Sequence, residues 1–125
     1  MRLTLLQNPF SMHYALADIP PFEITRGFMA RMIHTETMTI AFVDVAAGAA
    51  LPEHAHPQEQ VTNLLEGEFE LVVGGQPVRL TAGHSVVIPS NVPHSGRAFT
   101  ACRLLDVFQP VREDFRSGQV AYAVR

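Results

Sequence analysis

Glycine and proline divide this chain into segments that are too short for ordinary helices and have the composition of strands. The 8 glycines and 9 prolines recur along the sequence, and most segments between them are rich in β-branched and large apolar residues. Within residues 37–45 two sets of side chains alternate with period two, as in a strand. The expected strands are residues 26–33, 37–45, 61–65, 68–73, 77–80, 85–88, 101–109 and 119–124. Segments of this length and spacing predict an all-β sandwich or barrel.

Other segments lack the strand pattern. The Gly/Ala/Pro-rich residues 46–52 are expected to interrupt the sheet, and residues 111–117 to form at most one helical turn. Residues 1–25, with three prolines and little periodicity, are expected to form an arm that crosses the barrel or a partner subunit. A chain of 125 residues has the size of one domain, so residues 1–125 are predicted to be a single domain.

Charge and composition argue against several classes of function. The formal net charge is −3, and all 9 basic residues are arginines scattered from Arg2 to Arg125. This distribution argues against nucleic-acid binding and a polybasic membrane surface, and no lysine is available for Schiff-base chemistry. No apolar run approaches the ~18 residues of a membrane span, and the apolar start is too short for a secretory signal. The lone Cys102 cannot form an internal disulfide, so a cytoplasmic location is expected.

Histidines gather in one part of the sequence. His54 and His56 are two residues apart, so both imidazoles leave the same face of an extended chain, and Gln60 can return to that face four residues later. A barrel can bring His94 opposite this pair. Three imidazoles and one amide oxygen would then converge on one divalent cation. The other histidines, at positions 13, 34 and 84, are expected to have no metal role.

The frame around these residues resembles the cupin superfamily. The first cupin motif is matched by Gly48, His54, His56, Gln60 and Gly67, with Gln60 where most of the family has Glu. The second is matched by Gly83, Pro89 and His94, with Asn91 and Ala98 where Gly and Asn are usual. The resemblance implies a single jelly-roll barrel, or double-stranded β-helix, whose core spans residues 40–110 and contains both motifs. It also implies a bound divalent metal, with zinc, nickel, manganese and iron as the candidates.

Gln60 affects the expected chemistry of such a metal. A divalent ion with three neutral histidines and a glutamine keeps its charge of +2, whereas a glutamate would reduce it to +1. The higher charge strengthens Lewis acidity and disfavours an oxidised iron(III) state. We therefore expect an ion that polarises substrate oxygens rather than a redox centre.

A second cluster lies near the end of the chain. In residues 101–109 one face carries Cys102, Leu104, Asp106 and Phe108. A carboxylate among apolar neighbours is costly unless it is paired or functional. Two interpretations of Asp106 remain open: a structural clamp with Arg112, or a catalytic role. Cys102 is expected to be a small buried hydrophobe, and Glu113 and Asp114 to be solvated.

The tail LLDVFQPVREDF, together with HAHPQEQ, is similar to the small pectin-degradation cupins of the KdgF type. This resemblance implies linearisation of 4,5-unsaturated monouronates to 5-keto-4-deoxyuronates. It implies metal binding by His54, His56, Gln60 and His94, and functional roles for Asp106, Phe108 and Arg112. In these roles Arg112 would bind the substrate carboxylate, Asp106 would move a proton and Phe108 would form the apolar wall.

Two other functions remain possible from the sequence. One is an iron-dependent dioxygenase or other oxidoreductase, and the other is a non-catalytic cupin that binds a sugar or effector. In each case the expected partner is a small molecule, carboxylated in the preferred interpretation. A homodimer is also expected, because a small barrel exposes sheet edges. Its candidate contacts are the arm at residues 10–22 and the strand at residues 119–124.

Overall fold

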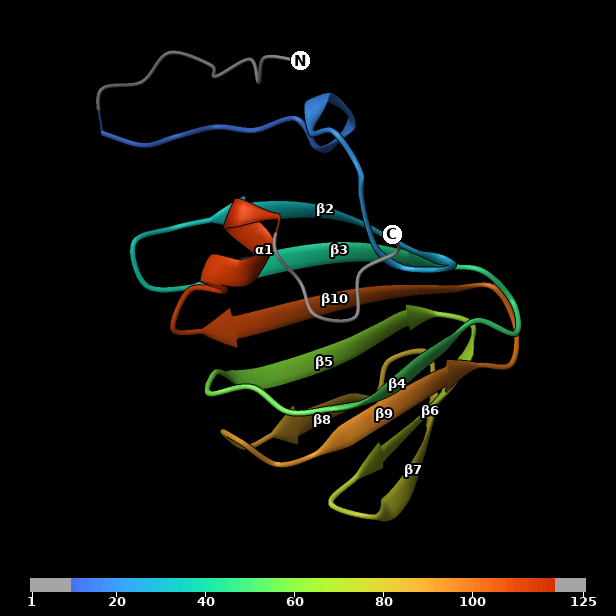
Figure 1. Ribbon diagram of the computed structural model, residues 1–125. Coiled ribbons are helices and arrows are strands. Elements are labelled where there is room, and N and C mark those ends of the chain that lie inside the picture. The colour runs from blue at the N-terminus through green and yellow to red at the C-terminus, as the bar shows by residue number, and fades with distance from the viewer. Residues whose placement is uncertain (1–9, 119–125) are drawn as a thin grey trace.

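The computed structural model describes residues 10–118 (Figure 1). Within this range the regular structure consists of ten strands, one 3₁₀ turn and one short helix. In chain order the elements are η1 (Leu16–Asp18), β1 (Phe22–Thr25), β2 (Phe28–His34), β3 (Thr39–Val45), β4 (Ala50–His54), β5 (Glu59–Glu66), β6 (Glu68–Val73), β7 (Gln76–Thr81), β8 (Ser85–Ile88), β9 (His94–Ala98), β10 (Cys102–Gln109) and α1 (Glu113–Ser117). No helix in the described range is long and apolar enough to cross a membrane.

The strands form two antiparallel sheets. The larger sheet has the order β1-β2-β3-β10-β5-β8, and the smaller one has the order β4-β9-β6-β7. Figure 1 shows the smaller sheet below β10 and β5. The chain passes from one sheet to the other between β3 and β4, β4 and β5, β5 and β6, β7 and β8, β8 and β9, and β9 and β10. This repeated exchange is the topology of a jelly roll, so the predicted all-β barrel is confirmed.

The core lies between the sheets and comes from one face of each strand. In β3 the side chains of Thr39, Ala41 and Val43 are buried, whereas Ile40 and Phe42 point outward and are partly exposed. The same alternation buries Ile24, Phe28, Ala30, Leu64, Phe69, Leu71, Leu80, Ile88, Ala98, Leu104 and Phe108. Because the inward residues of β3 are small, they leave space for a cavity next to Ala41.

Four parts of the strand prediction are corrected. The predicted strand 26–33 begins too early, because Gly27 makes a turn between β1 and β2, and β1 lies within the predicted arm 1–25. β4 lies partly within the segment predicted to interrupt the sheet, and β9 was not predicted. β4 is an edge strand, where Pro52 and polar residues are tolerated. The strand predicted at residues 119–124 lies outside the described residues.

The turn before β9 explains one departure from the cupin motif. Asn91 has φ +64°, in the left-handed region where glycine is usual and asparagine is tolerated better than most residues. Its backbone N–H donates to the carbonyl of His56 at 2.8 Å. This bond connects the turn that leads to His94 with the segment that carries His54 and His56. Asn91 therefore adopts the left-handed backbone conformation for which the cupin motif usually has a glycine.

Candidate metal centre

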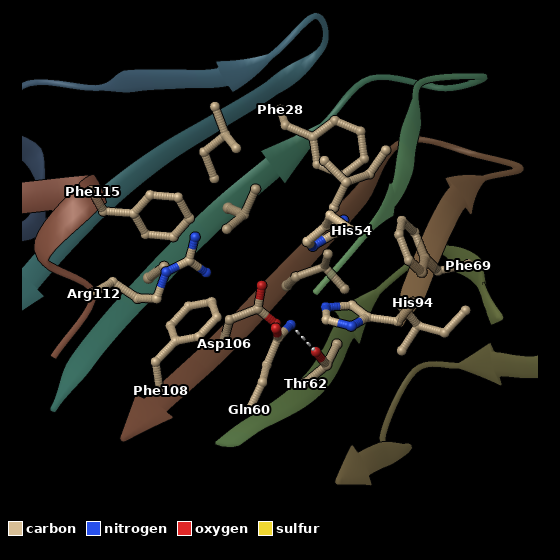
Figure 2. Close-up of a pocket in the computed structure, with 16 residues that line it drawn as sticks. Phe28, His54, Gln60, Thr62, Phe69, His94, Asp106, Phe108, Arg112 and Phe115 are labelled. Atoms are coloured by element: carbon tan, nitrogen blue, oxygen red, sulfur yellow. Dashed lines mark hydrogen bonds between the residues drawn. The ribbon is translucent and has the colours of Figure 1, made fainter. Parts of the chain in front are cut away.

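Neighbouring strands bring the four predicted metal ligands together. His54 ends β4 and is paired in register with His94, which begins β9 of the same sheet. Gln60 lies near the start of β5 in the larger sheet, and His56 lies in the short connection between β4 and β5. Figure 2 shows His54, His94 and Gln60 pointing into a common pocket between the two sheets.

The three histidines form a compact group. One ring nitrogen from each of His54, His56 and His94 lies within 4.8 Å of those of the other two. The ring centroids are 4.3 Å apart for His54 and His94, and 5.0 Å apart for His56 and His94. His56 and His94 are buried, and His54 is half-buried. In the described residues no other group of three or more His, Cys, Asp or Glu residues has this geometry.

Each imidazole is held by a backbone carbonyl two residues away in the sequence. The Nδ1 atoms of His54, His56 and His94 lie 2.7, 3.0 and 2.9 Å from the carbonyls of Pro52, Gln58 and Val92. A carbonyl only accepts, so each Nδ1 carries the proton and each Nε2 keeps a lone pair. Burial lowers the pKa of His54 and His56 to about 4, and it also lowers the pKa of His94. Near neutral pH all three rings are therefore uncharged electron-pair donors.

The donor set fits a divalent cation. His56 Nε2 lies 3.1 Å from Gln60 Oε1, so two electron-pair donors face each other at a distance that suits two ligands of one ion. The buried His94 Nε2 has no hydrogen-bond partner among the described residues. Neutral imidazoles with an amide oxygen are ligands that zinc, nickel, manganese and iron accept.

Asp106 lies on β10 opposite Thr62 of β5, next to the histidines. Its Oδ1 atom is buried without a hydrogen-bond partner in the described part of the chain. Burial raises the pKa of Asp106 to about 6, although hydrogen bonding with Thr62, the charge of Arg112 and hydrogen bonding with Gln60 act in the opposite direction. The carboxyl can therefore gain and lose a proton near neutral pH.

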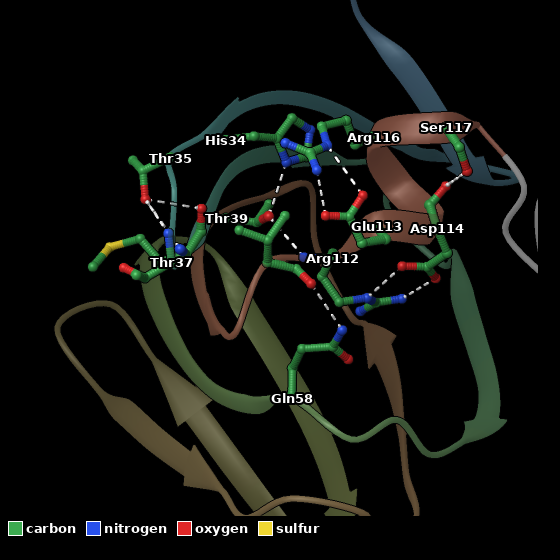
Figure 3. Close-up of polar contacts among 12 residues, drawn as sticks. His34, Thr35, Thr37, Thr39, Gln58, Arg112, Glu113, Asp114, Arg116 and Ser117 are labelled. Atoms are coloured by element: carbon green, nitrogen blue, oxygen red, sulfur yellow. Dashed lines mark hydrogen bonds and ion pairs between the residues drawn. The ribbon is translucent and has the colours of Figure 1, made fainter.

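Arg112 is the most deeply placed cation of the described range, with an exposed fraction of 2%. Its Nε and Nη2 atoms donate to the two carboxylate oxygens of Asp114 at 2.9 and 2.7 Å (Figure 3). Its guanidinium carbon lies 3.7 Å from the ring centroid of Phe115 and 4.9 Å from that of Phe108. Its backbone N–H donates to the buried Thr39 hydroxyl at 3.0 Å.

Of the two interpretations of Asp106 left open by the sequence, the structural clamp with Arg112 is not favoured by this arrangement. Asp114, which was expected to be solvated, is the ion-pair partner of Arg112. Asp106 interacts with Arg112 only as a nearby charge. The clamp is not favoured because two residues of the tail pair with each other as the chain turns into α1. Glu113 is exposed, as expected, and pairs with Arg116.

One cavity connects these groups. Its polar lining consists of His54, Gln60, Thr62, His94, Asp106 and Arg112. Its apolar wall includes Phe28, Phe69, Phe108 and Phe115, as Figure 2 shows. The free space is about 40 Å³, which is room for an ion and one or two water-sized groups. His56 lies behind this lining, with its ring 5.7 Å from that of Phe108.

Sequence reasoning missed several residues of the pocket, among them Thr62 and Phe115. Thr62 is two positions from Gln60 on the same strand face, so the period-two rule could have found it. No sequence pattern indicated that Phe115 lines the pocket, because its position depends on how the tail folds back over β10. His34 and His84 lie away from the cavity, next to Thr39 and Thr81.

Comparison with known proteins places this geometry in a family. Residues 41–108 match the family model described as "Cupin domain". The chain is 29% identical over 93 residues to the HTH-type transcriptional regulator PuuR of Escherichia coli, a match that covers 69% of this chain and 50% of PuuR. The chain thus spans about half the length of this curated relative.

Two solved structures are also similar. An RmlC-like cupin from Shewanella frigidimarina has a TM-score of 0.78 and 33% identity, with 84% of this chain and 96% of that chain covered. KdgF from Halomonas sp. has a TM-score of 0.75 and 24% identity, with 81% and 94% covered. The similarity to KdgF shows a shared fold and nothing further.

Proposed function

Because this chain belongs to the cupin domain family, we propose that it is a metal-dependent enzyme that acts on a small carboxylated sugar. The specific reaction we propose is the ring opening of a 4,5-unsaturated uronate. One observation carries this proposal: two uncharged imidazoles, a titratable carboxyl and a buried guanidinium line a single cavity, and a third uncharged imidazole, that of His56, lies directly behind the lining. The motif resemblance to KdgF-type cupins supports the choice of substrate.

We propose His54, His56, Gln60 and His94 as the residues that hold the ion. When bound, a divalent ion supplies Lewis-acid polarisation of substrate oxygens. The backbone carbonyls that accept from the histidine Nδ1 atoms keep the rings oriented for this purpose.

Arg112 supplies the charge that a uronate carboxylate requires. Its guanidinium is buried beside Asp106, so its attraction for an anion is screened less than at the surface. Asp114 and the two phenyl rings fix its position. A monouronate is larger than the free space of about 40 Å³, so binding requires the cavity walls to move apart.

Asp106 is proposed to move the proton. In an unsaturated uronate the C1 hydroxyl loses its proton to the carboxylate while the bond between C1 and the ring oxygen breaks. The electron pair of that bond stays on the ring oxygen, which becomes the oxygen of an enolate spanning C4 and C5. The carboxylic acid then returns the proton to C4, which leaves a ketone at C5 and an aldehyde at C1. The step is an isomerisation, and a pKa of about 6 suits a group that acts as both base and acid.

The test is an assay of ring opening with a purified 4,5-unsaturated monouronate. We expect Asp106→Asn to lower the rate by about 10²–10⁴-fold while the metal content stays that of the wild type. Asp44→Asn is the control, because Asp44 lies on the outer face of β3, paired with Arg103. If the wild-type protein has no activity on unsaturated uronates, the proposed reaction is wrong.

The likeness to PuuR favours a second candidate, a cupin that binds a carboxylated effector without converting it. In that case Asp106→Asn would leave ligand affinity intact, and the ligand would be recovered unchanged. Arg112 would still be needed, since anion recognition does not depend on turnover.

Several expectations from the sequence stay predictions. They are a single domain with an N-terminal arm, a cytoplasmic location, a homodimer and the absence of nucleic-acid binding. In the expected dimer contact, the exposed fractions are 95% for Phe10, 69% for Met12 and 41% for Leu16. An arm that contacts a second copy of the chain requires such exposed apolar side chains.

A further inference from the structure

Thr62 lies beside the candidate metal centre without being one of its expected ligands. It is 1% exposed, two residues after Gln60 on the same face of β5. It also lies directly opposite Asp106 on β10. Its hydroxyl oxygen accepts a hydrogen bond from Gln60 Nε2 at 2.8 Å, the dashed line in Figure 2. The Thr62 hydroxyl thus stands between Gln60 and Asp106.

The Gln60 amide has two different ends, and only one of them can bind a metal. One end lies 3.1 Å from His56 Nε2, and the other lies 2.8 Å from Thr62 Oγ1. The amide oxygen has lone pairs to offer a cation, whereas the amide nitrogen is a hydrogen-bond donor. If the two ends were exchanged, an N–H group would point at the histidines. The value of Gln60 as a ligand therefore depends on what holds its far end.

The Thr62 hydroxyl and the Asp106 carboxyl together favour one of these orientations. Hydrogen bonding with Thr62 and with Gln60 lowers the pKa of Asp106, because the carboxyl oxygens accept from the Thr62 hydroxyl and from the Gln60 amide nitrogen. Once the Thr62 proton is directed to Asp106, the Thr62 oxygen can only accept from Gln60. The amide nitrogen then faces Thr62, and Oε1 faces His56, as observed.

We propose that Thr62 is a positioning residue that turns the oxygen of the Gln60 amide toward the three histidines. This inference rests on the metal site proposed above. The carboxyl of Asp106 is thus linked to the metal position through Gln60, both directly and by way of Thr62. A glutamate at position 60 would not need to be oriented by Thr62, because either of its carboxylate oxygens can act as a ligand.

The first experiment compares Thr62→Val with the wild type. Valine has nearly the same shape and lacks the hydroxyl. We expect the affinity of the metal-free protein for Co²⁺ to fall about 10–100-fold, and the visible spectrum of bound Co²⁺ to change as an oxygen ligand is lost. Thr62→Ser should restore both. The matched control is Thr39→Val, which removes an equally buried hydroxyl that bonds His34 and the Arg112 amide instead. We expect it to leave Co²⁺ affinity unchanged.

The second experiment repeats Thr62→Val in a Gln60→Glu background. A carboxylate presents an oxygen whichever way it is turned, so the loss of affinity should disappear there. Thermal melting by circular dichroism establishes that each variant is folded. If the wild type does not bind Co²⁺, the metal site itself is wrong. If the wild type binds Co²⁺ but Thr62→Val binds equally well, or loses the same affinity in both backgrounds, the positioning role is wrong.

Discussion

Arg112 keeps its charge inside the molecule because Asp114 and two phenyl rings replace the water that it gives up. An unpaired buried guanidinium would cost several kcal/mol. Burial acts to raise the pKa of Asp114, but the hydrogen bonds and charge of Arg112 outweigh it, and the pKa is lowered from 3.8. The stability that this pair provides is therefore complete above pH 3.8. It is lost as the pH falls through the lower value of the folded state.

Removing the Asp114 charge tests this account at the level of one residue. We expect Asp114→Asn to lower the free energy of unfolding by about 2–3 kcal/mol at neutral pH, because the buried Arg112 loses the carboxylate to which its Nε and Nη2 atoms both donate. Urea denaturation measures the change. Glu113→Gln is the control, since Glu113 pairs with Arg116 at the surface, and it should cost less than about 1 kcal/mol. Equal losses for the two variants would contradict a special role for Asp114.

The candidate ligands could be predicted from the sequence, but the surroundings of Arg112 could not. His54 and His56 share a face by simple strand geometry, and the cupin frame identified Gln60 and His94. Arg112 directly precedes α1 and Asp114 lies in the first turn of that helix, and no strand or helix periodicity predicts that these two side chains meet. Only the fold of the tail determines that partnership.

Among the elements, β2, β3 and α1 meet at His34. Its Nδ1 lies 2.8 Å from the Thr39 hydroxyl, which also accepts the Arg112 N–H. Burial lowers the pKa of His34, Arg116 of α1 lowers it further, and Glu113 of the same helix raises it. The folded state thus binds the His34 proton less readily than the unfolded chain does. Stability is complete above pH 6.5 and is lost as the pH falls through the lower folded-state value.

Replacing His34, where β2, β3 and α1 meet, should make the stability of the protein less sensitive to acid. We expect the urea midpoint of the wild type to fall more steeply below pH 6.5 than that of His34→Gln, and the two curves to run parallel above it. His13→Gln, at an exposed position, controls for the loss of a histidine and should follow the wild type. Parallel curves throughout would mean that His34 titrates alike in the folded and unfolded states.

The turn between β5 and β6 depends on a glycine for two reasons. Gly67 has φ +95°, and a Cβ there would collide with the Ala101 carbonyl and lie 2.8 Å from Cys102 Sγ. Gly75, in the β6–β7 hairpin, has φ +81° but open space around it. Alanine at Gly75 should cost about 1 kcal/mol from backbone strain, and alanine at Gly67 about 1–3 kcal/mol more from overpacking. Chemical denaturation of both variants measures the difference, and equal losses would exclude the steric part.

Strands with an apolar buried face were predictable, and the two strands that carry His54 and His94 were not. The apolar alternation of β3 and β10 is evident in the sequence. β4 and β9 contain polar residues together with Pro52 and Gly96, and neither segment was predicted to be a strand. Gly96 leaves no room for a side chain, since a Cβ would lie 2.7 Å from the Phe69 ring. The two strands that bring His54 and His94 together are thus the ones with the weakest strand pattern.

At the scale of the whole molecule, the site exists only when the two sheets are packed. His54 and His94 come from the smaller sheet, and Gln60 and Asp106 come from the larger one. An unfolded chain would hold these groups too far apart to bind one ion with all of them. A metal that binds at this position therefore binds the folded state selectively, and its binding free energy adds to stability.

Metal addition and removal should therefore move the melting temperature. At an ion concentration of about 1,000 times Kd the gain is about 4 kcal/mol, which for a domain of this size raises Tm by on the order of 10 °C. We expect the wild type to respond to at least one of zinc, nickel, manganese or iron(II), and a chelator to reverse the shift. His94→Ala should melt at the same temperature with and without metal, because it lacks a buried ligand. His13→Ala should respond as the wild type does. A wild-type Tm that no divalent ion changes would contradict a site shared by the two sheets, since binding to the folded state alone cannot leave stability unaltered.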